Sequence, residues 1–112
     1  MVEYTNGSLD NTFHALAHPI RRAILARLAT HSATVLEIAD QFDISLNGVS
    51  KHLKVLEHAG LIQRNIQGRT HRCSLDTTRL REAGAWIDYY RPYWEQRLDA
   101  LERFLAEPGE DV

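Results

Sequence analysis

A chain of 112 residues, of which 44% are hydrophobic, is long enough to form one domain with a small core. Its single cysteine, Cys73, excludes an intramolecular disulfide framework and suits a cytoplasmic protein, and the sequence contains neither an apolar run of roughly 18 residues nor the basic-then-apolar layout of a signal peptide. The net charge of −2 does not exclude a nucleic-acid-binding protein, because residues 45–72 carry five Lys and Arg against one acid while the segments on both sides are acidic.

The first predicted element is a short helix that begins near residue 9. We expect residues 1–8 to form a flexible N-terminal tail, after which either Asp10 or Asn11 is suited to cap the helix. Phe13 and Leu16 lie on its apolar face.

A second short helix is predicted from Pro19 to about Ala29. Proline is favoured at the first position of a helix, and His18-Pro19 interrupts the preceding one. Arg21 and Arg22 fit either a structural ion pair or a phosphate contact, and we favour the ion pair.

Residues 34–58 predict two helices joined by a tight turn. Thr34 and Glu37 have the spacing of a capping box, Asp43-Ile44 makes the turn, and Ser45 is a suitable N-cap for the second helix. Four aliphatic residues recur along the second helix at three- and four-residue spacing and are expected to face the core: Leu46, Val49, Leu53 and Leu56. Gly48 is expected to weaken this helix by up to about 1 kcal/mol relative to alanine.

The opposite side of the second helix is polar. Asn47, Lys51 and Lys54 fall on that side, and Ser50 and His52 flank the apolar stripe. A helix that lies in the major groove of DNA has this layout, because one stripe anchors it to the core while polar side chains face outward from near its N-terminus. The alternative is an ordinary amphipathic helix pair with a solvated polar side.

A β-hairpin is predicted over residues 61–75, directly after the second helix. Gly60 suits the position that ends a helix, and a loop centred on Gln67-Gly68-Arg69 joins two short strands. The hairpin carries three arginines that can reach flanking phosphates or the minor groove: Arg64, Arg69 and Arg72. A helix-turn-helix followed by such a hairpin is a winged helix, so we expect a mainly α fold with a small β-hairpin.

Three segments of the chain, ALAHPIRRAILARL, LEIADQFDISLNGVSKHLKVLEHAGLI and GRTHRCSL, resemble the ArsR-type winged-helix repressors of bacteria. The resemblance covers roughly residues 12–105, and VSKHLKVLEHAGLI is its most specific part. It implies a homodimeric, DNA-binding repressor in which Ser50, Lys51 and His52 contact DNA and Arg69 lies in the wing.

The resemblance is to the members of the family that lack the usual metal-binding motifs. Val35 to Ile38 stand where thiolate-type sensors carry a Cys-x-Cys motif, and no histidine follows His71, where other sensors need histidine and acid pairs. His14 and His18 have a spacing that can bring two imidazoles to one metal, but no third ligand is evident, so we expect no metal or other cofactor.

The last segment, residues 77–106, is long and aromatic. An apolar seam at three- and four-residue spacing would leave a large exposed patch on a monomer, and a second identical chain would cover it. We therefore expect a homodimer whose interface combines this segment with the first helix, with the interface residues Phe13, Leu16, Leu80, Ile87, Tyr90, Trp94, Leu98 and Leu101. The alternative is that the segment folds back onto its own core.

Pro92 interrupts this seam. Proline removes a helical hydrogen bond and crowds the preceding turn, so we expect a kink or break near Tyr90-Arg91, with Pro92 opening a further helix. Residues 107–112 are expected to form a disordered tail.

Catalytic patterns are absent from the sequence. Ser50, His52 and Asp43 are residue types of nucleophilic catalysis, but Ser50 and His52 are two apart on a helix and do not face each other. For Cys73 the alternatives are a redox role and inert packing, and packing is the more common role of a cysteine in a strand. We therefore expect no enzyme.

The sequence thus predicts a single winged-helix domain over residues 9–106. Its expected function is sequence-specific binding of a pseudo-palindromic DNA operator by a cytoplasmic homodimer, through the helix over 45–59 and the wing over 61–75. The alternative is a winged-helix protein-interaction module that does not bind DNA.

Overall fold

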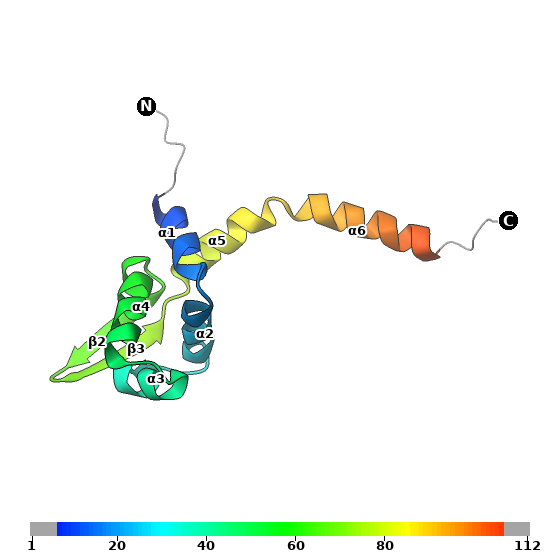
Figure 1. Ribbon diagram of the computed structural model, residues 1–112. Coiled ribbons are helices and arrows are strands. Elements are labelled where there is room, and N and C mark those ends of the chain that lie inside the picture. Colours follow the sequence, from blue (N-terminus) through cyan, green and yellow to red (C-terminus); the bar gives the residue numbers. More distant parts are fainter. Residues whose placement is uncertain (1–6, 107–112) are drawn as a thin grey trace, which may run out of the picture.

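A computed structural model describes residues 7–106 of the chain (Figure 1). Within this range the helices and strands are, in order, α1 Gly7–Leu16, α2 Pro19–Leu28, β1 Ala33–Thr34, α3 Val35–Phe42, α4 Leu46–His58, β2 Ile62–Gln67, β3 Thr70–Leu75, α5 Thr78–Asp88 and α6 Arg91–Ala106. The mainly α fold with a helix-turn-helix and a β-hairpin is confirmed. Residues 1–6 of the tail predicted over 1–8, and the whole tail predicted over 107–112, lie outside the described residues. The last two residues of the predicted N-terminal tail, Gly7 and Ser8, belong to α1 instead.

The sheet has three antiparallel strands in the order β1-β3-β2. Strands β2 and β3 form the predicted hairpin, with Ile62 opposite Leu75 and Gln67 opposite Thr70. Gly68, with a φ of 62°, occupies the first position of the two-residue turn, where a positive φ matches the twist of the strands. Strand β1 was not predicted, because two residues are too short to show periodicity; it pairs Ala33 with Cys73.

The caps that the sequence predicts around the helix-turn-helix are present. The Thr34 amide donates to Glu37 Oε1 (2.8 Å), and the Glu37 amide donates to Thr34 Oγ1 (3.2 Å), which completes the capping box. Ser45 Oγ accepts from the Gly48 amide at 3.0 Å and so caps α4. Asp43, in the turn, adopts the left-handed conformation at φ 53°. These local bonds set where α3 ends and α4 begins, and therefore how α4 is presented.

Helix α4 ends as expected at Gly60. The Gly60 amide donates to the Glu57 carbonyl and the Leu61 amide to the Leu56 carbonyl, both at 3.0 Å, which is the Schellman arrangement. Gly60 adopts a φ of 78°, a conformation that side chains other than glycine rarely tolerate. The chain therefore turns directly from α4 into the hairpin.

The core lies between α2, α3, α4 and the sheet, and its fully buried side chains include Ile24, Ile38, Val49, Leu53, Leu56, Leu61 and Cys73. Leu46 was expected to anchor α4 with Val49, Leu53 and Leu56, and that prediction is wrong. It is 49% exposed, because the first residue of α4 lies on the rim of a surface hollow rather than over the core.

Pro92 separates α5 from α6, as predicted. Helix α5 ends at Asp88 and α6 begins at Arg91. Pro92 is the second residue of α6, and in the first turn of a helix the backbone amides have no helical acceptor, so the missing amide hydrogen costs no hydrogen bond. Arg91 pairs with Asp88 across the break at 2.6 Å. The interruption therefore has both a proline and a local ion pair to position it.

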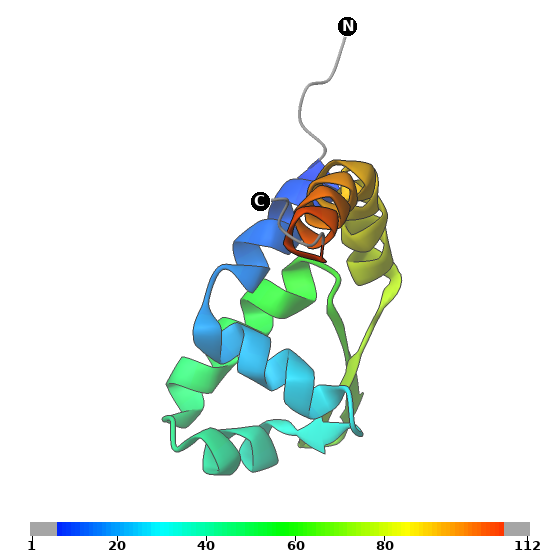
Figure 2. The same cartoon turned by 90° about the vertical axis from the view of Figure 1, so that its right-hand side faces the viewer.

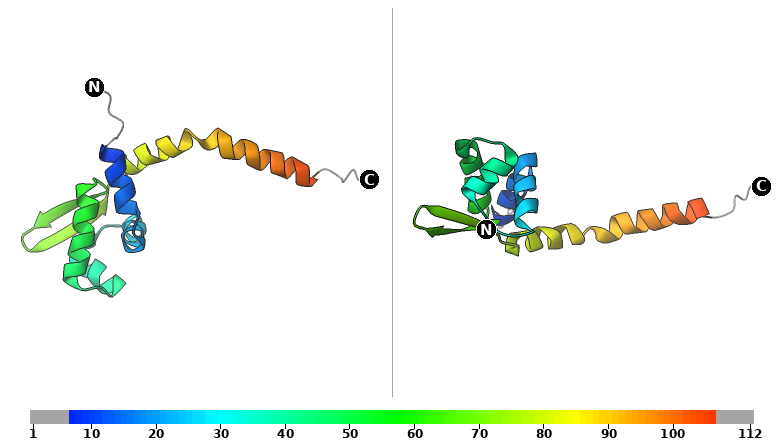
Figure 3. Two further views of the ribbon diagram at one scale, coloured as in Figure 1. Left: turned by 45° about the horizontal axis from the view of Figure 1, so that its top comes forward. Right: turned by 90° about the horizontal axis from the view of Figure 1, so that it is seen from below.

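Helix α1 lies against α5, while α6 projects away from the rest of the molecule (Figures 1 and 3). Figure 2 looks toward the free end of α6, in front of α1 and α5. The radius of gyration of 20.0 Å exceeds the value of about 13 Å expected for a compact chain of this length. The C-terminal segment does not fold back onto its own core. Among residues 7–106, no helix combines the length and apolar character needed to cross a lipid bilayer.

Candidate nucleic-acid interface

The outer side of α4 is polar and open. Asn47, Lys51 and Lys54 are exposed and Ser50 is half-buried, while Val49 and Leu53 on the inner side are fully buried. The helical period that placed the aliphatic residues inward therefore also placed these polar groups outward. The N-terminal half of α4 presents an amide, a hydroxyl and an ammonium group to solvent.

His52 lies apart from that exposed side. Its ring lies 4.5 Å from the ring of His18, and Arg21 Nη1 approaches His52 Nδ1 at 3.5 Å. Partial burial, and then the electrostatic interactions with His18 and Arg21, lower the pKa of His52 below its ordinary value of 6.5. The neutral imidazole is thus favoured, and the ring links α4 to the start of α2.

Arg21 and Arg22 bind the C-terminal end of α1. Arg21 Nε donates to the Ala15 carbonyl at 2.7 Å and Arg21 Nη2 to the His14 carbonyl at 3.0 Å; Arg22 Nη1 donates to the Leu16 carbonyl at 2.7 Å. Among residues 7–106 neither arginine forms the expected ion pair; both cations bind the carbonyls at the negative dipole end of a helix instead. The sequence could not predict these contacts, because the acceptors are backbone carbonyls and no residue type marks them.

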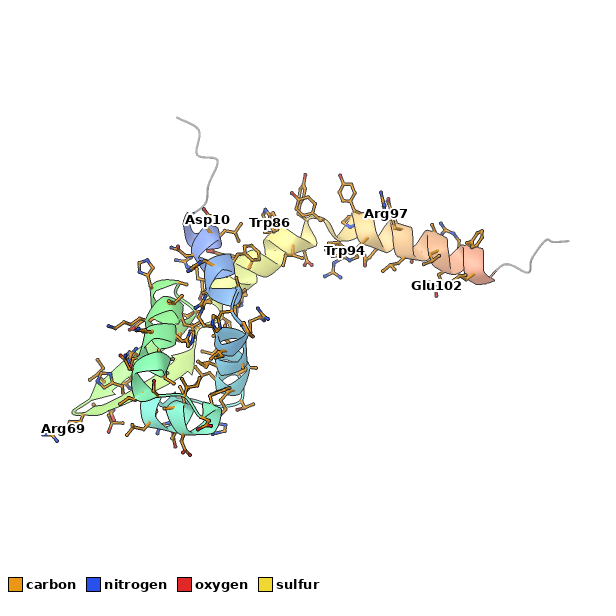
Figure 4. All side chains as sticks on the ribbon, viewed as in Figure 1. Asp10, Arg69, Trp86, Trp94, Arg97 and Glu102 are labelled. Carbon is orange, nitrogen blue, oxygen red and sulfur yellow. The ribbon has the colours of Figure 1, made fainter. Side chains whose placement is uncertain are left out.

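The three arginines of the wing differ in their surroundings. Arg69 lies at the tip of the hairpin, points away from the body of the protein and has no polar partner within residues 7–106 (Figure 4). Arg64 has only 13% of its side chain exposed and is held by Glu57 at 3.3 Å and His71 Nδ1 at 3.3 Å. Arg72 is exposed but donates to Ser32 Oγ at 3.1 Å. Arg69 is the wing cation that can meet a ligand without breaking an existing contact.

A hollow of about 460 Å³ joins the helix-turn-helix to the wing. Ser50 from α4 and Arg64 and Arg69 from the wing all line it, so the structure brings these three predicted site residues together. The remaining lining residues come from β1, α3, the start of α4 and the hairpin, and are Thr34, Val35, Leu36, Leu46, Thr70 and His71. The hollow and the exposed side of α4 form one continuous candidate surface.

His14 and His18, which have the spacing of metal ligands, lie in different surroundings. His18 Nδ1 accepts a hydrogen bond from the Ile20 amide at 3.1 Å and so caps α2, whereas His14 is exposed beside Lys54 and His58. Within the described part of the chain, no three His, Cys, Asp or Glu side chains gather closely enough to hold a metal ion.

Cys73 is fully buried in β3, and desolvation raises the pKa of its thiol. A buried thiol with a raised pKa forms little thiolate, the reactive species. This favours packing over a redox role.

The chain is similar to known transcriptional regulators over most of its length. Residues 16–64 match the helix-turn-helix domain family. The chain is 34% identical over 108 residues to the HTH-type transcriptional regulator Rv2034 of Mycobacterium tuberculosis, covering 96% of this chain and 98% of that protein. It is 35% identical over 79 residues to the transcriptional repressor SdpR of Bacillus subtilis, covering 70% and 88%.

A solved structure supports the same assignment. The crystal structure of the ArsR family transcriptional regulator RHA00566 matches with a TM-score of 0.75 and 38% identity, covering 85% of this chain and 97% of that one. An ArsR-like transcriptional regulator from Rhodococcus sp. RHA1 matches with a TM-score of 0.69 and 26% identity, covering 90% and 94%. The chain therefore belongs to the ArsR family of DNA-binding, winged helix-turn-helix transcriptional regulators.

Proposed function

We propose that this protein is a homodimeric repressor that binds a pseudo-palindromic operator, with α4 of each protomer in a major groove and the wing beside it. The observation that carries the proposal is that Ser50 of α4 and Arg69 of the wing line one hollow, next to the exposed Asn47 and Lys51. A recognition helix and a cationic hairpin on one surface can contact base edges and phosphates at the same time.

The roles differ among the candidate residues. Asn47, Ser50 and Lys51 stand near the N-terminus of α4, where a recognition helix meets base edges, and Lys54 and Arg69 are suited to hold phosphates. Arg72 can reach a phosphate only by releasing or sharing Ser32. His52 and Arg64 already have internal partners, so we assign them the positioning of α4 and of the wing rather than direct contact.

The homodimer is supported by the uncovered C-terminal segment. No side chain of α6 is buried, and its exposed residues include Trp94, Leu98 and Leu101; Ile87 of α5 and Tyr90 of the break between α5 and α6 are also exposed. Three of the predicted interface residues are already partly covered within the chain: Phe13, Leu16 and Leu80. The ring centroids of Phe13 and Trp86 lie 5.7 Å apart, and the two leucines pack against the core. We propose that these three residues position the interface helices rather than contact the second copy.

Binding to DNA at several salt concentrations tests this function. A random pool of duplexes is selected for binding, and the affinity of the selected duplex is measured between about 50 and 200 mM salt. Each lost phosphate contact reduces the slope of log K against log salt by about one, so Lys54→Ala with Arg69→Ala should reduce it by up to about two. Arg103→Ala, which removes a cation from α6, should leave the slope unchanged.

A flat salt response, or a double variant that binds like the wild type, would contradict the proposal. Gel filtration separates it from a protein-interaction module. A monomer that selects no duplex would favour that module, because α6 would then be open to another partner.

A further inference from the structure

Two leucines of the helix-turn-helix lie on the proposed DNA-binding surface instead of in the core. Leu36 is 68% exposed and Leu46 is 49% exposed, although hydrophobic periodicity assigns Leu46 to the buried stripe of α4. Both line the hollow that also contains Ser50 and Arg69. A single exposed leucine is ordinary, but two beside the polar, cationic side of a recognition helix offer an apolar contact to a ligand bound there.

We propose that Leu36 and Leu46 contact thymine C5-methyl groups and make this protein specific for thymine at the corresponding operator positions. The inference rests on the proposed binding of DNA. In the major groove the other base groups are hydrogen-bond donors and acceptors, while the thymine methyl is apolar and sets thymine apart from cytosine. A leucine offers no hydrogen bond and therefore favours the methyl group.

The position of each leucine agrees with this role. Leu46 is the first residue of α4, the end at which a recognition helix meets base edges, and Asn47 follows it directly. Leu36 is the second residue of α3, whose start is held by the Thr34–Glu37 capping box. Both side chains are therefore presented from capped helix starts rather than from a loose loop.

The hollow adds a steric argument. Apart from the aliphatic Val35, its other lining residues are polar and include Ser50, Arg69 and Thr70, so a base edge facing it would meet hydrogen-bonding groups and leucine side chains together. This is the combination needed to distinguish thymine from the other bases, because the methyl lies beside the O4 acceptor.

The test removes only the methyl group. A duplex selected from a random pool is compared with copies in which each thymine in turn is replaced by deoxyuridine. Affinities are measured for the wild type, Leu36→Ala, Leu46→Ala and His58→Ala, with thermal melting to check that each variant is folded. His58→Ala is the control, since it shortens an exposed side chain at the other end of the same helix, away from the proposed contact residues.

We expect at least one deoxyuridine substitution to weaken wild-type binding about fourfold, the value for one buried methyl group. That loss should disappear in Leu46→Ala or in Leu36→Ala and persist in His58→Ala. Equal binding of all deoxyuridine duplexes by the wild type, or a loss that persists in both leucine variants, would overturn the inference while leaving DNA binding intact. If no duplex is selected, the proposed function itself fails, and the inference with it.

Discussion

Gly48 shows how one residue can be misjudged from propensity alone. Glycine inside a helix costs up to about 1 kcal/mol relative to alanine, so replacement would appear to stabilise α4. A Cβ at this position would lie 2.9 Å from Ile44 Cγ2 and 3.2 Å from Ser45 Oγ, the atom that caps the helix. The glycine therefore allows the turn and the recognition helix to approach closely.

Replacing Gly48 with alanine is expected to destabilise the protein by about 1 kcal/mol, because overpacking outweighs the gain in helix propensity. Urea unfolding at fixed protein concentration measures the change. Gly84 in α5, where a Cβ would meet nothing within 4 Å, is the matched control, and Gly84→Ala should stabilise by about 0.5–1 kcal/mol. Equal stabilisation by the two alanine variants would show that the short distances from a Cβ at position 48 to Ile44 and Ser45 do not affect stability.

His52 predicts a pH dependence of stability. Its pKa is lowered in the folded state by partial burial and by His18 and Arg21, so folding favours the neutral imidazole. The unfolded chain binds the proton more readily. The contribution of His52 to stability is therefore fully present above pH 6.5 and is lost as the pH falls from there through the lower folded-state pKa.

Thermal melting between pH 8 and pH 5 checks this sign. The melting temperature of the wild type should fall more steeply below about pH 6.5 than that of His52→Gln. His58→Gln, at an exposed position on the same helix, should keep the wild-type dependence. Parallel curves for the wild type and His52→Gln would refute the coupling of His52 to Arg21 and His18.

At the scale of elements, the capping box connects β1 to α3. The Thr34 amide and side chain both bond with Glu37, and the bond from the Thr34 backbone lowers the pKa of the Glu37 carboxyl. Thr34 is both the last residue of strand β1 and the N-cap of α3. The start of α3, where Leu36 lies, is thereby tied to the wing.

Thr34→Ala should destabilise the protein by about 1 kcal/mol through loss of the side-chain cap. Thr34→Ser keeps the hydroxyl and should recover most of this loss. Urea unfolding of the two variants provides the comparison, and serine and alanine variants of equal stability would indicate that the hydroxyl contributes nothing.

At the scale of the whole molecule, the winged helix buries its apolar side chains within the chain, whereas the projecting α6 leaves its apolar side chains exposed. The wing, α2, α3 and α4 enclose a core, whereas α6 exposes Trp94, Leu98 and Leu101 along its length. Packing of these side chains against a second copy is the simplest way to cover them, and two-fold symmetry would then present two α4 helices together.

Leu98→Glu should convert the proposed dimer into a monomer of 12.8 kDa, because it places a charge in the apolar seam without touching the core of its own chain. Light scattering after gel filtration measures the mass. Gln96→Glu adds the same charge about 200° around the helix and should leave the dimer intact. A wild type that is itself a monomer, or a dimer that tolerates Leu98→Glu, would exclude this interface.

The sequence by itself determined the features that depend on neighbours three or four residues away. These include the capping box at Thr34, the N-cap at Ser45, the end of α4 at Gly60, the break before Pro92 and the outward direction of Lys51. Such contacts are local, so spacing and residue type are enough to predict them.

Only the tertiary structure decided which polar groups already have partners and which apolar groups do not. His52 meets Arg21 across 31 positions of sequence, Arg72 meets Ser32 across 40, and Leu46 lies beside the wing instead of over the core. The helical period predicts in which direction a side chain leaves its own helix. It does not predict which residue of another helix or strand lies in that direction. The division between positioning residues and free contact residues therefore depends on how α1, α2 and the wing pack around α4.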